Sequence, residues 1–110
     1  MSEKPSNKIP KFFEDFRAAY PGVAAHYNDL SEACRTAGPL DERTIELVKL
    51  GIAIGAAAEG AAHSHARRAL AAGATEQQLE HVALLAITTL GFPRAMTGLA
   101  WVRDVTKGGR

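Results

Sequence analysis

The chain of 110 residues contains one cysteine, few aromatic side chains and almost no net charge. Because Cys34 is alone, no intrachain disulfide can form, and a disulfide-stapled secreted fold is excluded. Aromatic residues make up 6% of the chain, whereas 21 residues are alanine. Strands favour aromatic and β-branched side chains, while alanine favours helices. The composition therefore predicts a helical protein.

Charge and hydropathy exclude further classes. The formal net charge is +1, with both signs mixed along the chain, so no basic face predicts binding to nucleic acid or anionic lipid. The longest uncharged apolar run, Leu50 to Ala58, is far too short to span a bilayer. The first ten residues hold no apolar run typical of a signal peptide. We therefore expect a soluble, cytoplasmic protein that binds neither nucleic acid nor membrane.

Apolar residues recur at helical spacing, and turn signals divide the chain into five or six helices. Asp41 is a good N-cap for the third helix, and Thr75 with Gln78 forms a capping box for the fifth. No sustained alternation predicts a strand. The expected helices cover about 10–20, 23–36, 41–57, 61–72, 75–90 and 93–105. The prediction is an all-α bundle with short connections.

We expect residues 10–105 to form one helical domain, between a flexible N-terminus over 1–9 and a flexible tail over 106–110. The third helix is apolar on nearly all sides, which is typical of a central helix. It also contains Gly51 and Gly55, and a glycine inside a helix costs up to about 1 kcal/mol. We expect another backbone to approach this face closely and compensate for that cost.

Two histidines and one carboxylate are the leading candidates for chemistry. Glu46 lies near the start of the third helix, and His63 and His65 lie early in the fourth. The histidines are about 200° apart around the helix, so we expect one to face inward and the other to face solvent. Structural alternatives exist for each: Glu46 can favour the helix dipole or pair with Arg43 or Lys49, and an inward histidine can be a hydrogen-bonded core residue.

A metal site is a weaker alternative. Glu59 and His63 are four residues apart on one helix face, and with His65 they offer residue types that bind zinc. No motif defines a third ligand, however. The sequence therefore predicts neither a metal nor an organic cofactor.

Three features occur together between Pro39 and Val105. These are the helix opening DERTIELVKLGIAIGAA, a histidine eight residues before the turn Gly-Ala-Thr in HARRALAAGATEQQLEHVALLAITTL, and the late Gly-Phe-Pro of GFPRAMTGLAWVRDV. In these features the chain resembles the carboxymuconolactone decarboxylase and alkylhydroperoxidase D family. The resemblance implies a helical bundle that assembles into trimers or hexamers.

The redox branch of that family carries the pattern E-x11-C-x2-C-x3-H, with cysteines at a helix start where the dipole favours thiolate. Glu46 and His65 match the first and last positions, but Ala58 and Ala61 stand where the cysteines would be. Cys34 lies far upstream, and we interpret it as a small buried hydrophobic residue. Alkylhydroperoxidase or peroxiredoxin-type activity is therefore disfavoured.

His65 and the segment Gly91-Phe92-Pro93 match the non-redox branch better, which resembles γ-carboxymuconolactone decarboxylase. Loss of carbon dioxide from such a lactone leaves a delocalised anion that must be protonated at carbon, and a histidine titrating near neutrality suits that transfer. We expect His65 to be the general acid and Glu46 its partner. Arg94 or Arg68 would bind the substrate carboxylate.

This interpretation predicts a cofactor-free lyase acting on a small carboxylated lactone or related acid. The alternative is a non-catalytic oligomeric scaffold in which Glu46 and His65 are remnants. Arg67 and Arg68 are also typical of a solvated helix face, so the substrate-binding role has a structural alternative too.

Overall fold

The computed structural model describes residues 11–108, and its helices confirm the all-α class: no strand occurs in that part of the chain. The described chain forms two compact units, one ending at Leu40 and the other beginning at Asp41. The expected flexible N-terminus, 1–9, and the last residues of the expected tail, 109–110, lie outside the described residues. A single domain over 10–105 stays a prediction.

The first unit contains α1 (Lys11–Ala19) and α2 (Pro21–Thr36), which contact each other. Pro21 lies in the first turn of α2, where its missing N–H costs nothing and its restricted φ suits a helix. We expected that helix to begin at Val23. Only Ala24 is buried in the two helices, and apart from the half-buried Phe16 their large apolar side chains are exposed.

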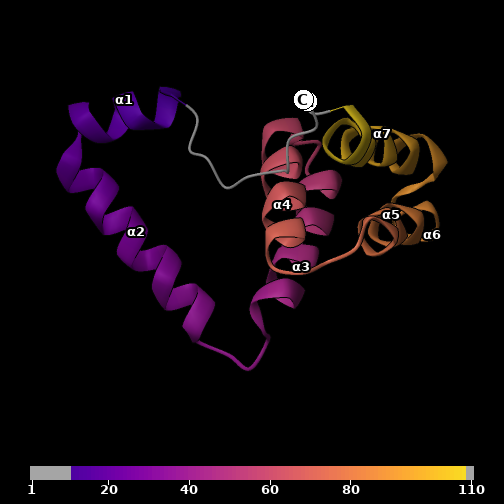
Figure 1. Ribbon diagram of the computed structural model, residues 1–110, viewed down its shortest axis with the longest axis horizontal. Helices are drawn as coiled ribbons and strands as arrows, with labels where there is room; N and C mark the ends of the chain where they lie inside the picture. The colour runs from indigo at the N-terminus through magenta and orange to yellow at the C-terminus, as the bar shows by residue number, and fades with distance from the viewer. Residues whose placement is uncertain (1–10, 109–110) are drawn as a thin grey trace. The chain divides into compact units, whose positions relative to one another are not determined.

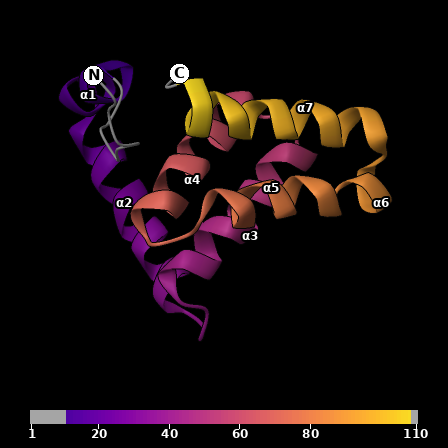
Figure 2. The same cartoon turned by 45° about the vertical axis from the view of Figure 1, so that its right-hand side comes forward.

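The second unit contains the remaining helices. They are α3 (Glu42–Gly55), α4 (Glu59–Ala71), α5 (Glu76–Leu85), α6 (Ile87–Leu90), α7 (Phe92–Arg103) and the π-helical turn η1 (Asp104–Gly108). Helices α3 and α4 lie side by side and make the most extensive helix contact of the unit (Figure 1). Helix α7 runs beside α5 and α6 and also contacts α3 and α4 (Figure 2).

Small side chains let these helices approach closely. Ala62, Ala66 and Ala69 form a buried stripe along α4, and they belong to the same core as Leu50 and Ile54 of α3. Residues i, i+4 and i+7 share one face of a helix, so the stripe presents little more than methyl groups to α3. The two histidines of α4 flank this stripe.

The tightest glycine is Gly98 of α7. A Cβ built there would lie 2.7 Å from Cγ2 of Ile54, which leaves no room for a side chain. Our expectation of a backbone approaching Gly51 and Gly55 is wrong, because a Cβ at each would meet the side chains of Val82 and Leu90 at 3.5 Å. Ordinary side-chain packing covers both positions.

The turn between α3 and α4 sets the position of the α4 histidines. The N–H of Ala58 donates to the carbonyl of Ala53 (2.9 Å), and the N–H of Ala57 donates to that of Ile54 (3.1 Å). This is a Schellman ending, in which the residue after the cap adopts a left-handed conformation. That residue is Ala57, with φ of 57°. The chain then reverses and begins α4 beside α3.

The helix that we expected from 75 to 90 is interrupted at Ala86, which separates α5 from α6. At the other end of α7, η1 extends into the segment expected to be a loose tail as far as Gly108, and its Val105 is buried. Ion pairs fasten this end to α5: Arg103 with Glu80 at 2.9 Å and Lys107 with Glu76 at 3.0 Å. The Arg103 guanidinium holds the pKa of the Glu80 carboxyl below its ordinary value.

Among the helices described between residues 11 and 108, none combines the length and apolar character needed to cross a membrane.

Candidate functional site

Glu46 and His65 meet between α3 and α4. Oε1 of Glu46 lies 2.8 Å from Nδ1 of His65, although the residues are 19 apart in sequence. Glu46 is only 2% exposed and is the one charged residue in the core of the described chain, whereas the His65 side chain is 18% exposed. The structure therefore brings together the two residues that the sequence suggested as an acid–base pair.

Local chemistry explains why α3 presents Glu46 at this depth. The Asp41 side chain accepts a hydrogen bond from the backbone N–H of Thr44 (2.8 Å). This N-cap begins the helix a little more than one turn before Glu46. Glu46 lies four residues before Leu50 and eight before Ile54, so all three share the buried face. A carboxylate is costly to bury without a partner. The contact with His65 explains why the fold can hold the Glu46 carboxylate in the core.

The carboxylate determines which ring nitrogen remains for other chemistry. An ionised carboxylate only accepts hydrogen bonds, so when Glu46 is ionised Nδ1 of His65 is the donor and carries a hydrogen. Within the described chain, Nε2 of His65 has no hydrogen bond. The pair therefore leaves Nε2 for exchange of a proton with a third group.

The two alanines at the expected cysteine positions begin α4. Ala58 is its N-cap residue and Ala61 lies in its first turn, four residues before His65. Cys34, in contrast, lies on α2 and is exposed, so our interpretation of it as a buried residue is wrong. Ala24 is the one residue of α2 that is buried in the described chain, and Cys34 lies outside any core.

The two candidate clamps differ in position. Arg68 is an exposed residue of the last turn of α4, three residues after His65, and Arg94 is partly buried in the first turn of α7. Neither guanidinium makes an ion pair with a residue in the described part of the chain. No hydrogen bond joins either of them to His65 there.

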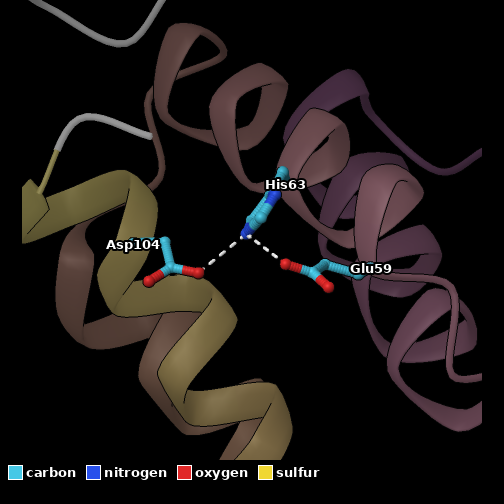
Figure 3. A group of neighbouring side chains, drawn as sticks. All are labelled: Glu59, His63 and Asp104. Atoms are coloured by element: carbon cyan, nitrogen blue, oxygen red, sulfur yellow. Dashed lines mark hydrogen bonds and ion pairs between the residues drawn. The ribbon is translucent and has the colours of Figure 1, made fainter.

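A second histidine site joins Glu59 and His63, which the sequence had suggested as neighbours, with Asp104, which it had not. Nε2 of His63 lies 2.9 Å from Oδ2 of Asp104 and 3.9 Å from Oε2 of Glu59 (Figure 3). Our expectation that one α4 histidine faces solvent is wrong, because the His63 side chain is only 12% exposed. Asp104 begins η1, 41 residues after His63, and no sequence pattern connects the two.

An open hollow with a volume of about 540 Å³ lies along α7 and η1. Its lining includes Asp104, Arg103 and Lys107, but neither His65 nor Glu46. The hollow thus adjoins the His63 cluster and not the predicted acid–base pair.

Comparison with known families identifies the class of protein. Residues 21–104, most of the chain, match the sequence model of the carboxymuconolactone decarboxylase family. The chain therefore belongs to the carboxymuconolactone decarboxylase family. The match extends from the start of α2 to the start of η1, so both histidine sites lie within it. No curated protein and no solved structure matches the chain.

Proposed function

We propose that this protein is a cofactor-free lyase that removes carbon dioxide from a small carboxylated lactone or a related acid. The observation that carries the proposal is the contact of 2.8 Å between Nδ1 of His65 and the buried carboxylate of Glu46. Family membership supports the reaction class.

The pair suits delivery of a proton to carbon. When the bond to the carboxylate group breaks, its electron pair stays on the lactone as a delocalised anion, and carbon dioxide leaves. His65 in its protonated form then gives the Nε2 proton to carbon and becomes neutral, and water restores the proton. Glu46 orients the ring and stabilises the positive charge, as the aspartate does in a Ser-His-Asp triad.

Arg68 and Arg94 are the proposed clamps for the carboxylate that the substrate keeps. A guanidinium binds a carboxylate through two parallel hydrogen bonds, which an ammonium group cannot reproduce. We expect Arg→Lys substitution at one of the two positions to raise KM about tenfold or more, with little change at the other position. Equal KM values for both variants and the wild type would remove the arginines from the proposal.

The first test measures carbon dioxide release from 4-carboxymuconolactone by the purified wild type and by His65→Ala. We expect the variant to be about 10²- to 10⁴-fold slower, the usual contribution of a positioned acid. His81→Ala is the matched control, because His81 is an exposed histidine of α5, and this variant is expected to keep full activity. Circular dichroism checks that each variant is folded.

Glu46→Gln tests the role of Glu46 apart from that of the proposed acid, His65. The substitution keeps the side-chain volume but removes the charge. We expect kcat to fall and KM to change little, since the substrate is not expected to touch Glu46. If the wild type releases no carbon dioxide from the lactone and related acids, the lyase is excluded in favour of the non-catalytic scaffold. Thiol-dependent reduction of a hydroperoxide is disfavoured, because Cys34 is the only cysteine.

A further inference from the structure

We propose that Glu59, His63 and Asp104 form a binding site for a divalent transition-metal cation, with Zn²⁺ as the probe. This site is separate from the Glu46–His65 pair and does not depend on the proposed lyase activity. It also differs from the ligand set that the sequence suggested, because Asp104 of η1 takes the place of His65.

The three ligand atoms are already close to the spacing that a cation requires. One atom from each side chain lies within 4.8 Å of the other two, and the separations from Nε2 are 2.9 and 3.9 Å. Zinc binds nitrogen and oxygen at about 2.0–2.2 Å in a tetrahedron, so its ligand atoms lie about 3.4 Å apart. Changes of about half an ångström would bring the two separations from Nε2 to this value.

The two carboxylates lie at different distances from Nε2 of His63. Oδ2 of Asp104 is 2.9 Å from Nε2 of His63, which is within hydrogen-bond range (Figure 3). Oε2 of Glu59 is 3.9 Å from the same nitrogen, which is beyond that range. The positive end of the α4 dipole favours an acid at Glu59, and the hydrogen bond with His63 places Asp104 of η1, so two carboxylates from different elements converge on one nitrogen. A dication bound to both carboxylates and a neutral imidazole would balance the charge.

The Glu59–His63–Asp104 cluster is held in place on one side and open to solvent on the other. The His63 side chain is 12% exposed, and the ion pairs of Arg103 and Lys107 with α5 hold the segment that carries Asp104. Access comes from Glu59, whose side chain is 47% exposed, and from the open hollow that Asp104 also lines. A cation could therefore enter from solvent and keep positions for water.

The donor set narrows the choice of metal. One imidazole nitrogen and two carboxylate oxygens suit Zn²⁺ or Mn²⁺, whereas Mg²⁺ takes oxygen ligands and Cu⁺ prefers sulfur. We therefore expect Zn²⁺ to bind more tightly than Mn²⁺, following the general order of affinities, and Mg²⁺ to bind least.

The test titrates Zn²⁺ into the metal-free full chain at pH 7 by isothermal calorimetry. We expect one ion per chain in the wild type. Asp104→Asn should bind Zn²⁺ at least about tenfold more weakly, since loss of even a group that only hydrogen-bonds to a metal ligand lowers metal affinity about 10- to 100-fold. The asparagine oxygen can still accept the hydrogen bond from His63, so this variant keeps the contact between α4 and η1. His63→Gln should show the same loss.

His81→Gln is the matched control, because it removes a histidine outside the cluster and should keep wild-type affinity. Zn²⁺ should also raise the melting temperature of the wild type and of His81→Gln, but not of Asp104→Asn. The proposal is overturned if the wild type binds no Zn²⁺, if Asp104→Asn binds as tightly as the wild type, or if His81→Gln loses the ion. All readouts are independent of lyase activity.

Discussion

At the scale of single residues, the burial of Glu46 is the least expected feature of this chain. A carboxylate that is 2% exposed costs free energy unless it is paired, and hydrophobic residues often replace a buried ion pair without loss of stability. Its contact with His65 at 2.8 Å supports a role for the pair in chemistry. His63 also contacts a carboxylate, that of Asp104. Each histidine of α4 is therefore held by an acid from another helix: His65 by Glu46 of α3 and His63 by Asp104 of η1.

Two helical glycines provide a residue-scale prediction. Gly98→Ala should lower the free energy of unfolding by about 1–3 kcal/mol, because the new Cβ would overlap the buried side chain of Ile54. Gly51→Ala is the matched control and should raise it by up to about 1 kcal/mol, since its Cβ would meet Val82 at an ordinary 3.5 Å. Urea unfolding measures both, and equal stability of Gly98→Ala and the wild type would contradict the packing argument.

At the scale of elements, two helices end in the same way with different residues. Both α3 and α4 close with a Schellman pattern, and the left-handed residue is Ala57 in one and Gly73 in the other. The N–H of Ala74 donates to Ala69 as that of Ala58 donates to Ala53, at 2.9 Å in each case. The left-handed residue carries a Cβ in the ending of α3 and none in the ending of α4.

This pair predicts opposite effects for reciprocal substitutions. Ala57→Gly should raise the free energy of unfolding by about 1 kcal/mol, because glycine adopts positive φ without a Cβ clash. Gly73→Ala should lower it by a similar amount, since no heavy atom lies within 4 Å of its new Cβ and the strain is the main effect. Thermal and urea unfolding would show both, and a loss of stability in Ala57→Gly would refute the account of the α3–α4 turn.

The N-cap of α3 predicts a dependence of stability on pH. Hydrogen bonds from the side chain and backbone N–H of Thr44 hold the pKa of the Asp41 carboxyl below its ordinary value of 3.8. A carboxyl whose pKa is lowered by folding stabilises the protein fully above its unfolded pKa, and this contribution disappears as pH falls through the folded pKa. The loss should therefore occur below about pH 4.

Asp41→Asn isolates this effect, because asparagine also caps helices but does not titrate. The difference in unfolding free energy between the wild type and this variant should be constant from about pH 7 to 5 and change only at lower pH. Urea midpoints measured along a pH series would reveal it. A difference that stays the same down to pH 2 would show that the Thr44 contacts do not depend on the charge.

At the scale of the whole molecule, exposed apolar side chains occur in both units. In the second unit they include Val48, Ile52, Leu84, Leu85, Leu90 and Phe92, and in the first Phe12, Phe13, Tyr20, Val23, Tyr27 and Leu30. Val48 and Ile52 are one helical turn apart on α3. Large exposed apolar patches on proteins are typical of sites of protein–protein contact. We propose, as family membership suggests, that copies of the chain assemble.

Sedimentation velocity tests this assembly. The wild type should sediment as a multiple of 11.7 kDa, with a trimer or hexamer expected. Ile52→Lys should reduce the mass, because a charge at an apolar contact is costly to bury, whereas Thr88→Lys, at an exposed polar position, should leave it unchanged. A wild type that sediments as a monomer at all concentrations would contradict the proposal.

The sequence by itself determined the helices and most of their ends. Capping depends on residues within one turn of each other, so Asp41 and the Thr75–Gln78 box were predictable and are confirmed. Family likeness suggested Glu46 and His65 together. Local patterns did not predict the break at Ala86, nor that α2 would leave Cys34 exposed.

Only the tertiary structure decided which side chains meet across helices. Asp104 joins His63 over 41 residues, and Gly98 is the glycine that packs tightly, because both depend on how α7 and η1 cross α4 and α3. Helical periodicity places a residue on a face of its own helix, but it does not say which face of another helix lies opposite. That pairing follows from packing the whole core, and it creates the second histidine site.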